Sequence, residues 1–246
     1  KSWPSENCLE ANSLAIQIHG GYGYTRDFPV EQYWRDNRLN MIHEGTHGIQ
    51  AADLLGRKVL MQNGAGLQLL ASTMTATIEK AMAVPALAGY AKDLAKALQE
   101  VGAATQAAWA TGKPQEALAN AVPYMQAFGH TVLAWVWLEL ALVVQAQDAS
   151  LSVAVNVGRM SATAYFYHYE LPKISAWLHV VRTRDMTCAH MPLLKPASRP
   201  RRRCLSLGDE LGRWRYCWWF RAVTLSSASG WLRWPGGTPS CAELTH

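Results

Sequence analysis

Apolar residues recur at three- and four-residue intervals along most of the chain, a spacing typical of α-helices. This spacing predicts a first helix over residues 5–18, ended by Gly20-Gly21. A second helix is expected over residues 29–40, because its first residue is a proline, which suits that position. A third is expected to reach about residue 61, with Thr46 as its N-terminal cap.

The third helix should end at Asn63-Gly64, and an alanine- and leucine-rich region follows. Pro85 predicts a kink or boundary within that region. Further helical segments are expected over residues 114–147 and 151–183, the latter containing Pro172. Because no convincing alternating strand pattern precedes residue 192, we predict an all-α, antiparallel helical bundle with an irregular C-terminal tail.

The tail differs from the rest of the chain in charge. Residues 193–246 hold nine Lys/Arg and three Asp/Glu, a net of +6, which leaves −1 for residues 1–192 because the whole chain carries +5. Its five tryptophans follow no period. We therefore expect residues 193–246 to be an irregular basic segment, disordered or non-native, and we expect no nucleic-acid partner.

Cysteine usage and hydropathy indicate the compartment. The five cysteines have neither metal-site nor disulfide spacing, which favours a reducing environment: the cytoplasm of a bacterium or the mitochondrial matrix of a eukaryote. Residues 1–7 form no signal segment and are expected to come from the middle of a longer protein. The most apolar run, residues 132–144, is shorter than the ~20 residues of a membrane span, so we expect a buried bundle helix and no span.

Two glycine-rich turns and one carboxylate lie within about thirty residues of each other. Glycines mark backbone that turns tightly or lets a ligand approach closely. A carboxylate followed by Gly-Thr at a helix start lies where backbone N–H groups point outward. The pattern suggests a phosphate-bearing cofactor and an acid/base residue in one place. Its residues are Gln17, Gly20, Gly21, Gly23, Glu44, Gly45 and Thr46.

The order and spacing of these residues, with Arg35-Asp36 between them, resemble the C-terminal helical domain of the acyl-CoA dehydrogenase family. There the pattern is Q-x-x-G-G-x-G, then R-D, then E-G-T. The close resemblance covers roughly residues 8–62. A looser one, to the helical extension of the subgroup that includes methylmercaptopropionyl-CoA dehydrogenase, continues to about Asp185.

The resemblance implies a chemical role for Glu44. Family members oxidise an acyl-CoA thioester between its α- and β-carbons, and a carboxylate takes the α-proton while a hydride passes to FAD. Such a carboxylate works best in an apolar, dehydrated site. The base's own backbone N–H is one donor to the developing enolate oxygen. Glu44 alone would be typical of an ordinary acid near a helix N-terminus, but its register with Gly45-Thr46 favours the catalytic role.

The resemblance also implies cofactor contacts. Gln17, Gly20 and Gly21 would contact the adenosine and pyrophosphate end of an FAD bound mainly by a neighbouring subunit, although a helix C-cap explains the glycines equally well. Thr46 would lie near the FAD of its own site. The family often has Gln, Glu or Asp where this chain has Gly48, which weakens the ribose contact.

Two further patterns have other interpretations. Arg35-Asp36 is better explained as a structural ion pair than as catalytic machinery. Residues 43–47 also spell H-E-x-x-H, a zinc-protease signature in which His43 and His47 would bind the metal. Gly-Thr inside the required helix argues against a metalloprotease, and we predict no metal site.

We therefore predict the C-terminal fragment of an FAD-dependent acyl-CoA dehydrogenase, inactive without the N-terminal domains. Residues 1–62 would belong to the catalytic helical domain and residues 63–192 to a helical extension domain. The resemblance implies an acyl-CoA substrate, a homo-oligomer, and an electron-transfer flavoprotein or similar acceptor. The alternative is a non-enzymatic helical interaction module.

Overall fold

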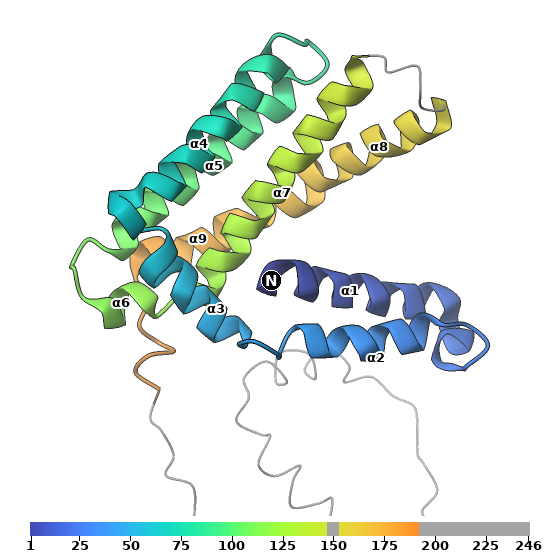
Figure 1. Cartoon of the computed structure of the whole chain (residues 1–246), viewed down its shortest axis with the longest axis horizontal. Helices are drawn as coiled ribbons and strands as arrows, with labels where there is room; N and C mark the ends of the chain where they lie inside the picture. Colours follow the sequence, from blue (N-terminus) through green and yellow to red (C-terminus); the bar gives the residue numbers. More distant parts are fainter. Residues whose placement is uncertain (147–152, 192–246) are drawn as a thin grey trace, which may run out of the picture. The chain divides into compact units, whose positions relative to one another are not determined.

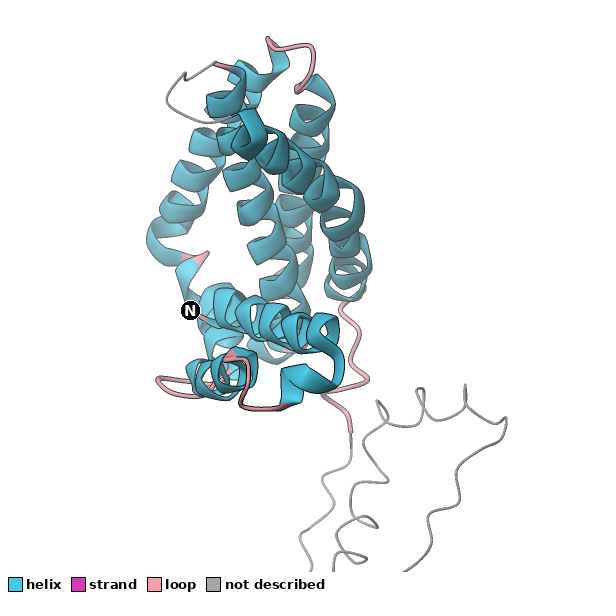
Figure 2. Ribbon diagram, turned by 90° about the vertical axis from the view of Figure 1, so that its right-hand side faces the viewer, coloured by secondary structure: helices cyan, strands magenta, loops and turns pink. Residues whose placement is uncertain are grey.

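The computed structural model describes residues 1–146 and 153–191, and these residues form helices joined by short turns (Figures 1 and 2). No strand occurs within them. Residues 1–191 make one compact unit. The all-α prediction is therefore confirmed, whereas the predictions for residues 193–246 fall outside the described residues.

The first part of the chain is a helical hairpin followed by a shorter helix. Its elements are α1 (Ser2–His19), the 3₁₀ turn η1 (Gly20–Tyr24), α2 (Val30–Asn40) and α3 (His47–Asp53). The first helix starts three residues earlier than expected, and Pro29 lies just before the second helix as its cap. The glycine pair ends α1 as predicted, because Gly20 has a positive φ of 61°.

The larger part is a set of long helices that pack side by side (Figure 1). After the π turn η2 (Leu54–Lys58), the elements are α4 (Met61–Met82), α5 (Ala88–Ala108), α6 (Pro114–Leu118), α7 (Ala121–Gln145), α8 (Val153–Tyr165), the π turn η3 (Phe166–Glu170), the 3₁₀ turn η4 (Leu171–Lys173) and α9 (Ile174–Thr183). Near the start of α4, residues 62–64 all have left-handed φ angles, so the helix breaks where Asn63-Gly64 predicted.

The two helical segments expected over residues 114–147 and 151–183 are each interrupted. The first breaks at residues 119–120, where the Asn120 side chain donates a hydrogen bond to the Asp185 carbonyl (2.8 Å). The second passes through η3 and η4 between α8 and α9, where Pro172 has no N–H to continue an α-helix. The first break thus coincides with a contact to a distant carbonyl, whereas the second is local to the proline.

Small side chains let the bundle helices approach closely. Alanines alternate with larger residues on the buried faces of α5 and α7, and Tyr124 fills the space between those helices, bonded to Thr105 (2.7 Å). The core also receives side chains from α4 and α9. Its members include Met74, Ile78, Ala91, Leu94, Ala97, Val101, Ala104, Ala127, Ala134, Leu138, Ala141, Leu178 and Val181.

Helix α7 is longer than the apolar run in the sequence suggested. Its 25 residues are enough, by length and composition, to cross a membrane, a test that the core helix of a soluble bundle also passes. In this structure it contacts α4, α5, α8 and α9, and Ala134, Leu138 and Ala141 are fully buried there. These contacts make it the central helix of the bundle.

The α1–α2 hairpin, in contrast, has almost no core of its own. Only Ser2 and Ser5 are buried on α1, and no residue is buried on α2. Ile18 and Tyr24 are each 85% exposed. Other large apolar side chains exposed on the hairpin are Leu14, Tyr22, Tyr33, Trp34 and Leu39. A large share of exposed apolar side chains, when they form one patch, usually marks a contact with another protein surface.

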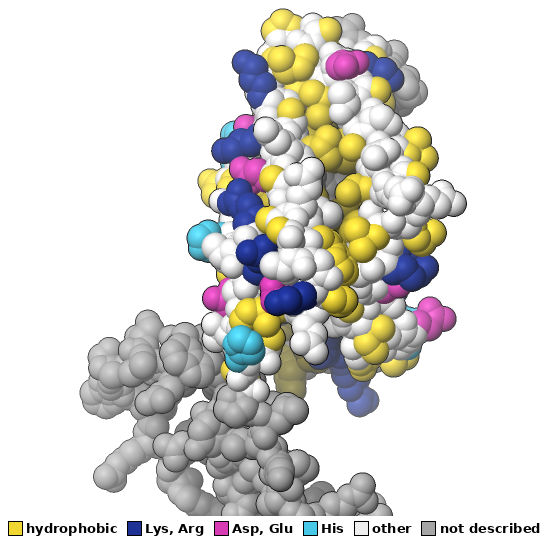
Figure 3. Space-filling model, turned by 90° about the vertical axis from the view of Figure 1, so that its left-hand side faces the viewer, with side chains coloured by type: hydrophobic (Ala, Val, Ile, Leu, Met, Phe, Trp, Pro, Cys, Tyr) yellow, Lys and Arg dark blue, Asp and Glu magenta, His cyan; other side chains and the backbone are white. Residues whose placement is uncertain are grey.

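The face of α4 and its neighbours has a different character (Figure 3). Charged side chains of both signs lie along one edge, and apolar side chains form a band beside them. An i,i+4 pair of Arg57 and Asp53 (2.6 Å) belongs to the preceding segment. Exposed pairs of this kind contribute little to stability, because solvent screens them.

Trp3 joins the start of α1 to the first half of α7. Its ring lies against Gly129, where an added Cβ would be only 2.2 Å from Trp3 Cδ1. Its Nε1 donates to Nδ1 of His130 (2.8 Å), and the two rings meet edge to face. The glycine thus leaves room for the indole, and the histidine fixes its orientation.

His130 is buried, with 4% of its surface exposed. Burial lowers the pKa of its imidazole, against the opposing influence of the Gln126 carbonyl and the Glu170 carboxylate. Its Nε2 lies 3.6 Å from Glu170, which also pairs with Lys173 (2.6 Å). Glu6 and Glu10 of α1 and Trp177 of α9 line the same cleft, whose volume is about 410 Å³. The neutral ring accepts the indole N–H, and a protonated ring could not.

We expect Gly129→Ala to destabilise the chain by about 1–3 kcal/mol, because the new methyl group displaces the Trp3 ring. Gly102→Ala is the matched control on α5, where an added Cβ meets nothing within 4 Å, and it should stabilise by up to about 1 kcal/mol. Urea unfolding of both variants measures the difference. Equal effects at the two glycines would contradict the close packing of Trp3.

We expect stability to fall as the pH is lowered through the ordinary histidine pKa of 6.5, because the unfolded chain binds a proton at His130 more readily than the folded chain does. His130→Asn retains an acceptor for Trp3 without a titrating group, so its melting temperature should fall less between pH 7.5 and 5.5. The control His179→Asn, at an exposed position, should keep the parental slope. Thermal unfolding followed by circular dichroism tests this, and identical slopes for all three chains would contradict it.

Candidate functional site

Glu44 lies in the turn that joins α2 to α3, and its side chain is exposed. Its φ is 55° and that of Gly45 is 104°, so two consecutive residues are left-handed. A residue with a Cβ in this region is disfavoured by about 1–2 kcal/mol. Such conformations cluster at functional sites, where the surrounding structure holds them. Glu44 therefore combines its sequence motif with a left-handed backbone, which Gln62, Asn63 and Arg184 also have.

Two side-chain donors hold this turn. Gln50 Nε2 on α3 donates to the Glu44 carbonyl (2.8 Å), and Lys1 Nζ donates to the Gly45 carbonyl (2.5 Å). A neutral hydrogen bond contributes about 0.5–1.5 kcal/mol, which is comparable to the cost of one left-handed residue. A Cβ at residue 45 would lie 2.8 Å from Gln50 Nε2, so a larger residue would displace this amide, and the φ of 104° itself favours glycine.

Thr46 precedes α3 in an extended conformation, as a capping residue does. Its side chain makes no capping hydrogen bond, although its carbonyl accepts the N–H of Gln50 (3.0 Å). The prediction that Thr46 caps the helix is correct for the backbone and wrong for the hydroxyl. The exposed hydroxyl remains available to a ligand beside Glu44.

Gln17, Gly20 and Gly21 lie at the other end of α1, and all three are exposed. An added Cβ at either glycine would meet nothing within 4 Å, so the backbone there is open to an approaching group. This arrangement fits a phosphate-bearing ligand, with the Gln17 amide as donor or acceptor. Gly23, in contrast, has a structural role, because a Cβ there would lie 2.5 Å from the Ile16 carbonyl oxygen.

The two halves of the predicted site do not come together. The start of α1 lies beside the Glu44 turn, since Ser2 Oγ bonds to His47 Nδ1 (2.8 Å) and Lys1 bonds to Gly45. The 18 residues of α1 span about 27 Å at 1.5 Å per residue, and Gln17 is near the far end. Within one chain, the Glu44 turn and the open glycines therefore lie in two separate places, and the predicted cofactor contacts stay a prediction.

Arg35 and Asp36 do not pair with each other. Arg35 pairs with Glu31 (3.1 Å), one turn earlier on α2, and Asp36 accepts a hydrogen bond from Gln32 (2.6 Å). Neighbouring residues on a helix point in different directions, whereas residues four apart share a face. The predicted ion pair is replaced by two local contacts within α2.

The H-E-x-x-H spelling does not form a zinc-protease helix. His43 and Glu44 lie in the turn, and α3 begins only at His47. His43 Nδ1 faces the Leu39 carbonyl (3.2 Å), while His47 faces Ser2. Among residues 1–146 and 153–191, no three His, Cys, Asp or Glu side chains are placed to hold a metal ion.

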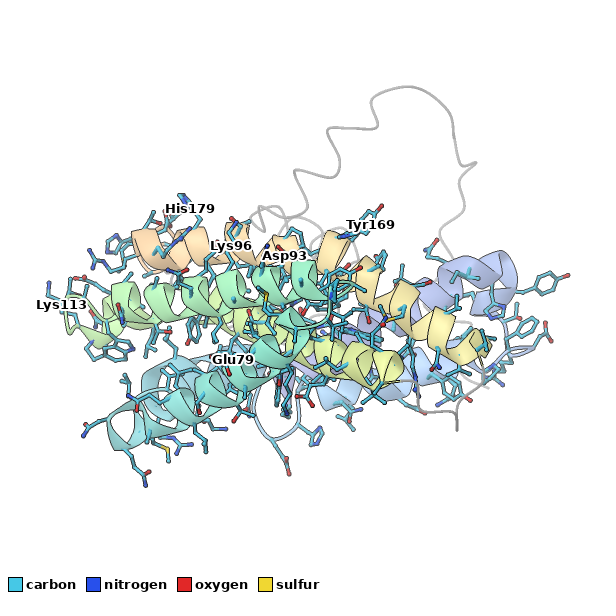
Figure 4. The ribbon with its side chains drawn as sticks, turned by 90° about the horizontal axis from the view of Figure 1, so that it is seen from above. Glu79, Asp93, Lys96, Lys113, Tyr169 and His179 are labelled. Carbon is cyan, nitrogen blue, oxygen red and sulfur yellow. The ribbon has the colours of Figure 1, made fainter. Side chains whose placement is uncertain are left out.

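Several other titratable side chains on the bundle surface lie apart from one another (Figure 4). Figure 4 shows Asp93 and Lys96 on α5 and His179 on α9 pointing outward, with Glu79 and Lys113 on separate segments. All of them are exposed. Apart from the cleft around His130, which Glu6, Glu10, Glu170 and Lys173 also line, the Glu44 turn and the open glycines of η1 are the candidate sites in the described residues.

Sequence reasoning missed Gln50 and Lys1, which hold the turn. The only local signal for Gln50 was its place four residues after Thr46, in the first turn of the expected helix. Neither residue forms a recognised motif with Glu44. Their contribution depends on a backbone conformation that only the structure displays.

Comparison with known proteins identifies two matching regions. Residues 1–60 match the family profile "Acyl-CoA dehydrogenase, C-terminal domain", and residues 70–192, half of the chain, match "Acetyl-CoA dehydrogenase C-terminal like". Thr46 and Glu44 lie in the first region, and the bundle helices lie in the second.

Three relatives illustrate the match. The 3-methylmercaptopropionyl-CoA dehydrogenase of Ruegeria pomeroyi is 36% identical over 155 residues, 62% of this chain and 26% of that protein. The broad-specificity linear acyl-CoA dehydrogenase FadE5 of Mycobacterium tuberculosis is 25% identical over 193 residues, 74% of this chain and 32% of that protein. Subunit CarC of the caffeyl-CoA reductase-Etf complex of Acetobacterium woodii is 45% identical over 56 residues, 23% of this chain and 15% of that protein.

The matched part of the chain thus spans between a quarter and a third of the length of its first two relatives. The profile matches, the helical bundle and the resemblance found in the sequence agree with one another. On this evidence the chain belongs to the acyl-CoA dehydrogenase family.

Proposed function

We propose that this chain is the C-terminal part of an FAD-dependent acyl-CoA dehydrogenase and that Glu44 is its catalytic base. The observation that carries the proposal is the left-handed turn at Glu44-Gly45, within the region matched to the family's C-terminal domain. Residues 1–62 would belong to the catalytic helical domain and residues 63–192 to the extension domain. The left-handed break at residues 62–64 supports that division.

Glu44 would take the α-proton of an acyl-CoA thioester. FAD, when bound, supplies the acceptor for the hydride that leaves the β-carbon. The backbone N–H of Glu44 would donate to the thioester oxygen as negative charge develops there. One residue thus presents a proton acceptor and a hydrogen-bond donor, and the turn fixes the angle between them.

Proton removal from a weakly acidic carbon requires a base shielded from water. Glu44 is exposed on this chain, and its apolar neighbours Ile42 and Ile49 are 50% and 63% exposed. The cover must then come from another domain or subunit. We therefore propose that the isolated chain has no dehydrogenase activity.

The cofactor would contact two different parts of the chain. Thr46 would lie by the FAD of its own site, and Gln17, Gly20 and Gly21 would contact the FAD of a neighbouring subunit. The length of α1, about 27 Å, supports this arrangement. The start of α1 lies beside the Glu44 turn, and its other end carries Gln17 and the glycines for the second site. The proposal thus implies a homo-oligomer. An electron-transfer flavoprotein is the proposed acceptor, since one relative is named as a subunit of an Etf complex.

Glu44→Gln should lower turnover by about 10²–10⁴-fold without loss of FAD, because glutamine keeps the shape of the side chain but cannot act as a carboxylate base. The test uses a complete enzyme, made by joining this chain to the N-terminal part of the Ruegeria pomeroyi relative. Turnover is followed with an artificial electron acceptor, and FAD content by absorbance. Glu31→Gln, on α2, is the control and should keep parental turnover. Parental turnover in Glu44→Gln would assign the base elsewhere.

The isolated chain should self-associate through the exposed face of the α1–α2 hairpin. The double variant Leu14→Ser, Ile18→Ser removes two apolar side chains one helical turn apart and should shift the chain toward monomer. Leu69→Ser, at an exposed position on α4, should not. Sedimentation velocity over a wide concentration range measures the distribution. A parental chain that stays strictly monomeric would contradict the expectation.

FAD binding separates this function from the alternative, a helical interaction module without catalysis. The complete enzyme described above should retain FAD, and Gly21→Asp should weaken retention by placing a negative charge beside the phosphates. An enzyme that folds and oligomerises but neither holds FAD nor turns over would favour the interaction module.

A further inference from the structure

Gln50 connects the first turn of α3 to the turn that carries Glu44. It lies six residues after Glu44, and its side-chain amide donates to the Glu44 carbonyl oxygen (2.8 Å). Its own N–H bonds to the Thr46 carbonyl (3.0 Å), so its backbone belongs to the helix while its side chain reaches back. The half-buried amide therefore ties a rigid element to a strained one.

The contact acts on the atoms that set the direction of the Glu44 side chain. With φ at 55°, the Cα–Cβ bond of Glu44 points to a different side of the chain than it would in a right-handed turn. The Glu44 carbonyl and the Cβ are attached to the same Cα, so fixing the carbonyl also fixes the origin of the carboxylate. The Glu44 N–H lies on the other side of the same Cα and is oriented by the φ of 55°.

The lack of a side chain at Gly45 leaves room for the Gln50 amide to reach the Glu44 carbonyl. Its φ of 104° suits glycine, and the space a Cβ would need is occupied by Gln50 Nε2 at 2.8 Å. The Gly45 carbonyl is held from the other side by Lys1. The turn is thus held between α3 and the start of α1, with the Glu44 side chain left exposed to solvent.

We propose that Gln50 is a positioning residue that holds the Glu44-Gly45 turn left-handed and thereby aims the Glu44 carboxylate and N–H at the substrate. This inference rests on the proposed role of Glu44 as the base. Gln50 touches neither substrate nor cofactor in this proposal. It acts through the backbone of Glu44 alone.

Two substitutions test the hydrogen bond without a large change of shape. Gln50→Met removes the donor at nearly constant length. Gln50→Glu replaces the donor with a carboxylate, which repels the Glu44 carbonyl. Gln99→Met, at an exposed position on α5, is the matched control. All three keep a helix-compatible side chain.

The first measurement uses the full chain and does not depend on activity. With glutamate isotopically labelled, the NOE between the N–H and Hα of Glu44 reports the sign of its φ, because these two protons are closest when φ is positive. The strong NOE should be present in the parent and in Gln99→Met, and weakened in Gln50→Met and Gln50→Glu. An unchanged NOE in both Gln50 variants would overturn the proposal.

The second measurement uses the complete enzyme described above. Both Gln50 variants should lower kcat by about 10- to 100-fold, Gln50→Glu more than Gln50→Met, because small misplacements of a catalytic group have effects of that size. KM, FAD content and melting temperature should stay close to the parent. A loss of kcat that follows a loss of FAD or of stability would indicate a general structural role and overturn the proposal, as would parental kcat.

The two measurements separate this inference from the proposed function. If Glu44→Gln keeps parental turnover, Glu44 is not the base, and the positioning role fails with it even though the NMR result still describes the turn. If Glu44→Gln is inactive and the Gln50 variants turn over normally, the base is correctly assigned and only the role of Gln50 is wrong.

Discussion

The position of the candidate base depends on how the first turn of α1 is held. Trp3 fits against Gly129 and donates to His130, which fixes the start of α1 on α7. The two residues before it, Lys1 and Ser2, then reach the Glu44 turn and the first residue of α3. The packing of Trp3 on α7 thereby helps to fix the position of the Glu44 turn. The hairpin itself contributes little, because almost none of its side chains are buried.

The sequence predicted those parts of the fold that local chemistry determines. Gly20 ends α1, and residues 63–64 interrupt the helical path near the start of α4, since glycine and asparagine tolerate positive φ angles. The break at Asn120 was not predictable, because its partner is the carbonyl of Asp185, 65 residues later. Similarly, Arg35 was assigned to its sequence neighbour, whereas helical geometry pairs it one turn away. Errors arose wherever a distant or geometric partner decided the outcome.

The same distinction applies to the candidate site. The motif located Glu44, Gly45 and Thr46, but it did not reveal that Glu44 itself is left-handed. Nor did the spacing along the sequence reveal that a rigid helix of 18 residues separates Glu44 from Gln17. Gln17 and Glu44, 27 positions apart in sequence, suggested one cluster, whereas α1 places them at two separate positions. Gln50 carried no recognisable signal, because its contact is with a backbone carbonyl rather than a side chain.

The distribution of strain and exposure points to a division of labour within the protein. The bundle of α4, α5, α7 and α9 holds the apolar core, and its His130 holds the start of α1 through Trp3, so it serves as support. The α2–α3 turn holds the left-handed Glu44 and Gly45, and the hairpin exposes large apolar side chains. A strained base without cover makes chemical sense only if another surface completes the site and excludes water. The exposed face of α1 and α2, beside that base, is where such a surface would dock, so cover for the base and burial of the hairpin would come from one and the same contact.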